Sequence, residues 1–211
     1  MSREQFKEIS VDKLDLKMLY KSAYSGKREP RIVEIPSMQY ITFSGKGAPE
    51  SQLFQDAMGV LFPLAYTIKF MFKERDKDFV VAPVEGQWWS KDLSSFNENR
   101  KEDWLWKLMI CVPSYVSQSD FDAAKMKLQA KSNPTGLEHV ILETIEDGES
   151  VQVLYIGPYS GEAETIAGMH HNAKEQGYKL RSHHREVYLS DMRRTAPGKL
   201  KTIIRHPIEK V

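Results

Sequence analysis

The sequence predicts an α+β fold in which two similar modules, each a strand, a helix and two further strands, form one domain. The main observation is that this order of elements occurs twice along the chain, with Gly- or Pro-containing loops between the elements. The third and fourth elements of the halves also end alike. The matched pairs are Trp88-Trp-Ser90 with Tyr188-Leu-Ser190, and Cys111-Val-Pro113 with Arg205-His-Pro207. Two such modules packed side by side should leave a ligand groove along their pseudo-twofold axis.

Residues 1–30 are charged, and we expect an arm or a short helix that lies on the main domain. The domain covers residues 31–207. Its first module, about 31–113, should contain a strand at 31–43, a helix at 50–73, a strand at 79–89, a polar loop at 90–103 and a strand at 104–113. Pro36 should mark an edge or bulge of the first strand, and Pro63 a kink or fresh start in the helix.

A connecting helix at about 117–131 follows, for which Ser119 is the expected N-cap. The segment 140–145 gives no clear pattern. The second module, about 150–207, should contain a strand at 150–157, a helix at 162–176, and strands at 182–190 and 199–207. Gly177 directly follows the helix and is a natural residue to end it.

Composition excludes several classes of protein. The 30 Lys and Arg residues balance 29 Asp and Glu residues in the 211-residue chain, for a net charge of +1. This is not the basic surface that nucleic-acid binding requires. No apolar run is long enough to cross a membrane, and the N-terminus has no apolar signal core. Cys111 is the single cysteine and is expected to be an inert core thiol, which fits a reducing cytoplasm.

The strand at 182–190 carries the main candidate residue. Side chains alternate between the two faces of a strand, so Val187 and Leu189 should pack on the core. Glu186 and Tyr188 then share the other face. Glu186 is either a solvated charge at the rim or the acid of an apolar cleft, and the aromatic residues of the chain favour the cleft. With the two halves aligned, Gly86 takes the place of Glu186, and Trp88 faces Tyr188.

Aromatic side chains could line such a cleft. All four tryptophans fall in two adjacent predicted strands, where core packing is the alternative role. Trp88 and Trp106 are the pair that we expect to form flat walls for a planar ligand. Tyr155 is either a core tyrosine or a hydroxyl donor to the ligand close to Glu186.

Metal and phosphate sites are not expected. The adjacent histidine pairs, at 170–171 and 183–184, should lie on the surface, and no spacing of His, Cys and Asp suits zinc. The loop that begins at Ser44-Gly-Lys-Gly lacks the pattern of a phosphate-binding loop. We therefore expect no metal and no other cofactor.

Several short motifs resemble the GyrI-like small-molecule-binding family. They are Gly157-Pro-Tyr followed by Glu162, Gly177-Tyr178, Arg185-Glu-Val-Tyr-Leu-Ser-Asp191, Val84-Glu-Gly-Gln-Trp-Trp89 and Trp104-Leu-Trp106. The family includes effector-binding domains of AraC-type and multidrug-sensing MerR-type regulators. The first half is similar to a stand-alone branch reported to hydrolyse cyclopropane-bearing genotoxic natural products. Residues 1–30 are too short for a DNA-binding helix-turn-helix, which departs from the regulator pattern.

The resemblance implies an aromatic cleft with one central glutamate, which maps onto Glu186. The aromatic positions map onto Tyr155, Tyr188, Trp88 and Trp106. The first hypothesis is an enzyme in which Glu186 activates a water that opens a strained ring, helped by the hydroxyl of Tyr155 and without a cofactor. The second is a non-catalytic module that binds a planar aromatic or cationic molecule. The third is an interaction domain with a filled groove. The sequence does not specify an oligomeric state.

Overall fold

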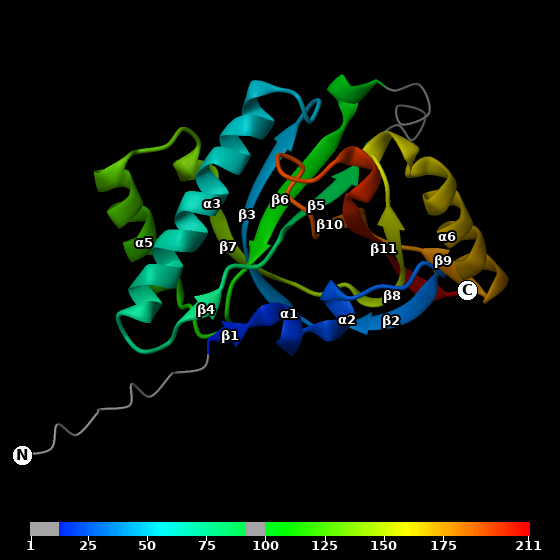
Figure 1. Ribbon diagram of the computed structural model, residues 1–211, viewed down its shortest axis with the longest axis horizontal. Helices are drawn as coiled ribbons and strands as arrows, with labels where there is room; N and C mark the ends of the chain where they lie inside the picture. Colours follow the sequence, from blue (N-terminus) through cyan, green and yellow to red (C-terminus); the bar gives the residue numbers. More distant parts are fainter. Residues whose placement is uncertain (1–12, 92–99) are drawn as a thin grey trace, which may run out of the picture.

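A single large sheet with helices on both of its faces forms the centre of the molecule (Figure 1). The computed structural model describes residues 13–91 and 100–211, so the first part of the expected arm and most of the polar loop at 90–103 lie outside the described residues. The helices are α1 (Leu16–Leu19), α2 (Lys21–Tyr24), α3 (Gln52–Lys73), α5 (Gln118–Lys131) and α6 (Ala163–Glu175). The strands are β1 (Leu14–Asp15), β2 (Arg31–Ile35), β3 (Met38–Lys46), β4 (Phe79–Val80), β5 (Val84–Trp89), β6 (Leu105–Cys111), β7 (Ile141–Ile145), β8 (Gly148–Ile156), β9 (Tyr178–Leu180), β10 (His184–Tyr188) and β11 (Lys201–Lys210).

The order of the strands confirms the pseudo-twofold repeat. Among the described residues the large sheet runs β2-β8-β11-β10-β5-β6-β3-β7, with β9 paired to β11. The first module supplies β3, α3, β5 and β6, and the second supplies β8, α6, β10 and β11. Strands β10 and β5 are antiparallel neighbours at the middle of the sheet. The boundary between β10 and β5 is called the seam below.

The outermost strands are exchanged between the modules. Strand β2 precedes the first module in the chain but pairs with β8 of the second module. Strand β7 precedes the second module but pairs with β3 of the first. The single strand expected at 31–43 is therefore wrong: it breaks at Pro36, which has no N–H for a sheet, and its two parts lie far apart in the strand order. The segment at 140–145, which had no clear pattern, is the exchanged strand β7.

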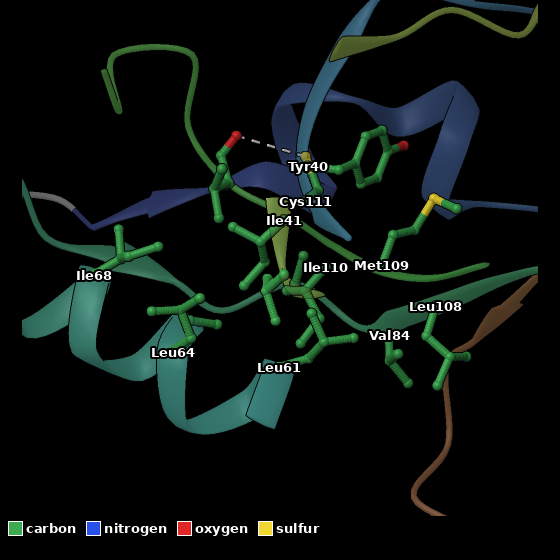
Figure 2. Close-up of a cluster of buried hydrophobic side chains, with 14 of the residues drawn as sticks. Tyr40, Ile41, Leu61, Leu64, Ile68, Val84, Leu108, Met109, Ile110 and Cys111 are labelled. Atoms are coloured by element: carbon green, nitrogen blue, oxygen red, sulfur yellow. Dashed lines mark hydrogen bonds between the residues drawn. The ribbon is translucent and has the colours of Figure 1, made fainter. Parts of the chain in front are cut away.

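Helices α3 and α6 pack on the same face of the sheet, one on each module. Leu61, Leu64 and Ile68 of α3 lie against Ile41, Val84, Leu108 and Ile110 of the strands in a buried apolar cluster (Figure 2). Met169 and Ala173 of α6 contribute to a second cluster with residues of β8 and β11. Helix α3 continues through Pro63 and does not restart there. The burial of its apolar face against the sheet offsets the lost hydrogen bond.

The opposite face of the sheet carries a buried ionic network under α1 and α2. Arg185 donates to Glu85 at 3.1 Å and to Asp147 at 2.9 Å, and Arg205 donates to Asp147 at 3.3 Å. The Tyr24 hydroxyl of α2 donates to Glu85 at 2.7 Å. All four charged side chains are at most 3% exposed, and the two arginines balance the two acids. The bond from Tyr24 to Glu85 therefore attaches the N-terminal helices to the sheet.

Other details differ from expectation. The cap of α5 is Ser117 rather than Ser119, because Ser117 and Asp120 form a reciprocal capping box. The strand expected at 79–89 is divided into β4, which pairs in parallel with β1, and β5. Cys111 is buried as expected, and burial raises the pKa of its thiol. In the described part of the chain, no helix combines the length and apolar character needed to cross a membrane.

Candidate functional site

Glu186 lies at the seam, on the face that α3 and α6 cover. Its Cα partner across the seam is Gly86, so the alignment of the two halves predicted from sequence is found in the sheet. Val187 is fully buried on the other face, as alternation along the strand requires. The Glu186 side chain is 14% exposed, and its Oε1 lies 3.1 Å from Nε2 of His184. Glu186 is therefore held in place by a neighbour and is not a freely solvated charge.

Trp88 and Tyr188 meet across the seam, over Gly86. The indole Nε1 of Trp88 donates a hydrogen bond of 3.0 Å to the hydroxyl of Tyr188. A Cβ added at Gly86 would lie 2.8 Å from this indole nitrogen and 3.1 Å from the hydroxyl. Position 86 therefore needs glycine for the two rings to meet next to Glu186.

The tryptophans differ in their surroundings. Trp88 is 8% exposed and stacks on Phe54 of α3, with 5.8 Å between the ring centroids. Trp106 is fully buried behind it, against Phe54 and Phe43. This placement supports a ligand contact for Trp88. It gives Trp106 a packing role, since a ligand could reach Trp106 only after neighbouring rings move.

Two tyrosines lie near the end of β8. The hydroxyl of Tyr155 donates a hydrogen bond of 2.9 Å to the backbone carbonyl of Pro158. This contact favours a structural role for Tyr155 over donation to a ligand. The ring of Tyr159 packs edge-on against Tyr188, with 5.6 Å between centroids. Burial, with the nearby charges of Glu162 and Glu186, raises the pKa of Tyr159 to about 12. Tyr159 therefore lies close to both acids, as Tyr188 does, and its position next to Pro158 in the matched motif was the available signal.

Glu162, which precedes α6, is a second acid in this cluster. It is 5% exposed, and its Oε1 has no hydrogen-bond partner among the residues that the structure describes. Burial and the nearby Glu186 raise the pKa of Glu162 to about 9. This shift favours the protonated form of Glu162. We call Glu162, Glu186, Tyr159, Tyr188 and Trp88 the acid–aromatic cluster.

The raised pKa of Glu162 predicts a pH-dependent effect on stability. The folded state keeps the proton of Glu162 up to about pH 9, while the unfolded chain releases it near the ordinary value of 4.5. Wild-type stability should then fall as the pH rises between these values, by at most about 1.4 kcal/mol per pH unit from this group. Glu162→Gln removes this loss. The free energy of unfolding of the variant, measured in urea, should therefore increase relative to that of the wild type from pH 5 to pH 8.

The exposed Glu164, in the first turn of α6, provides the matched control. Glu164→Gln should change the free energy of unfolding by no more than about 0.5 kcal/mol, as is usual for a surface substitution. A Glu162→Gln variant whose stability difference does not change with pH would show that the carboxyl is not held in its neutral form.

Three histidines come together beside the cluster, contrary to the surface positions expected for His170 and His184. His170 of α6, His184 of β10 and His206 of β11 are half-buried, and one ring nitrogen from each lies within 4.8 Å of the others. Burial and neighbouring imidazoles lower the pKa of His170 to about 4 and of His206 to about 3. Spacing along the chain could not reveal this group, because its members come from three different elements. His171, the neighbour of His170, is exposed as expected.

Two hollows of the described surface lie against the outer side of α6. One contains Arg28, Pro30 and Thr165, and the other contains His170, Tyr178 and Leu180. Neither includes Glu186. The Glu186 side chain keeps 14% of its surface exposed, and beside it the indole of Trp88 and the hydroxyl of Tyr188 are hydrogen-bonded to each other.

Aromatic side chains with a few polar or charged groups among them, as in the acid–aromatic cluster, are the usual lining of a small-molecule site. The sequence matches the GyrI-like small molecule binding domain over residues 28–209, and the chain belongs to this family. A comparison with curated proteins finds no match.

Solved structures agree with this assignment. An uncharacterised conserved protein from Listeria innocua is 34% identical, with a TM-score of 0.88 over 93% of this chain and 100% of that chain. A protein from Listeria innocua described as a hydrolase is 33% identical, with a TM-score of 0.83 over the same shares. The C-terminal domain of EcmrR has the same fold at 13% identity, with a TM-score of 0.55 over 87% of this chain and 98% of that domain.

Proposed function

We infer that the protein hydrolyses small electrophilic molecules that carry a cyclopropane ring, by adding water to the ring. The observation that carries this proposal is the close approach of two acids in the acid–aromatic cluster. Glu186 is hydrogen-bonded to His184, whereas Glu162 is buried, and burial together with the nearby Glu186 raises the pKa of Glu162. Such a pair provides one group that accepts a proton and one that donates a proton.

In the proposed reaction, Glu186 accepts a proton from a water molecule. The water oxygen forms a bond to a cyclopropane carbon, and the C–C bond of the ring breaks. The electron pair of that bond moves onto the carbonyl conjugated with the ring, where Glu162 or the hydroxyl of Tyr159 supplies a proton. The product is the substrate plus one water, and relief of ring strain drives the step without an oxidant or reductant.

The aromatic members of the cluster hold the substrate. Trp88 and Tyr188 offer flat faces for a planar conjugated molecule, and entry of that molecule must separate rings that now touch each other. Tyr159 takes over the donor role expected of Tyr155, because Tyr159 packs against Tyr188 while the hydroxyl of Tyr155 is engaged with Pro158. Trp106 supports Trp88 from behind.

The relative from Listeria innocua described as a hydrolase supports an enzyme, since it covers nearly the whole chain at 33% identity. The alternative function is a non-catalytic module that binds a planar cation beside the two acids, through charge and cation–π contacts. A balanced net charge and the absence of a basic surface from the composition argue against nucleic acid as the partner. The single, buried thiol fits a cytoplasmic protein.

A direct test is to incubate the purified protein with a cyclopropane-bearing alkylating compound and to analyse the mixture by mass spectrometry. We expect a product heavier by one water, formed faster than in buffer alone. A protein boiled before mixing, at the same concentration, controls for uncatalysed addition. Recovery of unchanged compound bound to the protein would instead support the binding module.

A further inference from the structure

We propose that His170, His184 and His206 form a binding site for one divalent transition-metal ion, with zinc as the best fit. The proposal rests on the three imidazoles, and zinc binding can be measured whether or not the acid–aromatic cluster hydrolyses a substrate. We call these three residues the histidine triad.

The fold brings the histidine triad together from three elements. Arg185 is the Cα partner of Arg205, so the preceding His184 and the following His206 lie opposite each other on β10 and β11. His170 approaches from α6, which covers this face of the sheet. The His170 and His206 rings meet edge-on at 5.0 Å between centroids, and the His184 and His206 rings at 6.1 Å. The sheet and the helix therefore aim three rings at one point.

The hydrogen bonding of the triad leaves ligand atoms free. Nε2 of His170 and Nδ1 of His206 are both buried, and neither has a hydrogen-bond partner among the residues that the structure describes. A buried polar atom without a partner is costly, so such atoms call for an explanation. A metal ion would satisfy both nitrogens at once.

The geometry suits an imidazole-bound metal. Tetrahedral zinc with three His ligands at 2.0–2.1 Å needs ligand nitrogens about 3.3 Å apart. The triad nitrogens already lie within 4.8 Å of one another, so small ring rotations reach this spacing. The neutral imidazole is the form of histidine that binds a metal.

The surroundings supply the remaining parts of such a site. The carboxylate of Glu186, 3.1 Å from Nε2 of His184, would orient that ring as an outer partner, as carboxylates commonly do for metal-binding histidines. His170 also lines a surface hollow beside α6, which gives an ion a path from solvent. Three protein ligands leave a fourth position open for water or a small ligand.

The test uses the full chain, with any affinity tag removed and metals stripped by a chelator. Zinc binding is measured by calorimetry and by competition with a chromophoric chelator, and cobalt binding by its visible spectrum. We expect one ion per chain and the intense visible bands of tetrahedral cobalt. Glu186→Gln removes an outer partner and should weaken zinc binding by roughly 10- to 100-fold, which is typical for such a loss. His170→Asn and His206→Asn each remove a ligand and should weaken zinc binding by more than this.

His171→Asn is the matched control, because His171 is adjacent to His170 but its side chain is 70% exposed and pairs with Glu175. This variant should bind zinc as the wild type does. Zinc affinity that survives in His170→Asn and His206→Asn, or an octahedral cobalt spectrum in the wild type, would overturn the proposal. The cobalt spectrum of the wild type decides the question even if a variant does not fold.

Discussion

Replacing Asp147 by alanine is expected to lower the free energy of unfolding by about 3–5 kcal/mol. Asp147 is 3% exposed and bonds both Arg185 and Arg205, which are themselves fully buried. Without the carboxylate, two buried guanidinium groups lose their shared partner, and Glu85 alone cannot neutralise both. The cost of an uncompensated buried charge is far larger than that of a lost surface pair.

Urea unfolding followed by circular dichroism measures this loss. Asp191→Ala is a matched control, because Asp191 also pairs with two arginines, Arg193 and Arg194, but at the surface. The control should unfold close to the wild type. Equal midpoints for Asp147→Ala and Asp191→Ala would mean that the buried network does not stabilise the fold.

Replacing Glu186 by glutamine should reduce turnover of a cyclopropane substrate by roughly 100-fold or more, the usual scale for loss of a general base. Glutamine keeps the shape of the side chain and can still bond His184, so we expect ligand affinity to stay within several-fold of the wild type. A loss of turnover with little change in binding separates a chemical role of Glu186 from a role in holding the ligand.

Single-turnover kinetics and ligand titration on the same preparations measure the two quantities. Glu164→Gln, on the exposed side of the first turn of α6, is the control and should retain full turnover. If Glu186→Gln hydrolyses the compound at the wild-type rate, Glu186 has no part in the chemistry. If Glu186→Gln fails to bind it, the charge of Glu186 serves recognition instead.

The repeat could be predicted because each half of the sequence contains its own local patterns for a strand, a helix and two further strands. Aligning the two halves put Gly86 in the place of Glu186, and in the sheet these two residues are Cα partners across the seam. The exchange of β2 and β7 could not be predicted, because strand pairing over a long separation leaves no mark in the local sequence. Pro36 was expected to mark an edge or bulge of one strand, whereas the structure divides the segment there into β2 and β3.

The candidate site was predicted less completely than the fold. Alternation along the strand placed Glu186 and Tyr188 on one face, which needs only local geometry. The structure places Arg185 on the opposite face, where its partner Asp147 comes from the turn before β8, and no local pattern joins the two. Glu162 and the histidine triad were not predicted for the same reason, because their chemistry depends on burial and on neighbours from other elements.

The reciprocal placement of β2 and β7 interlocks the two modules. If the chain were cut between the modules, the first fragment would contain β2, which pairs with the second module, and the second fragment would contain β7, which pairs with the first. Neither fragment would then have its complete set of paired strands. This exchange of edge strands opposes a hinged separation of the two modules. We therefore expect a ligand to be admitted by movement of the side chains and helices above the sheet, with the strand order of the sheet unchanged.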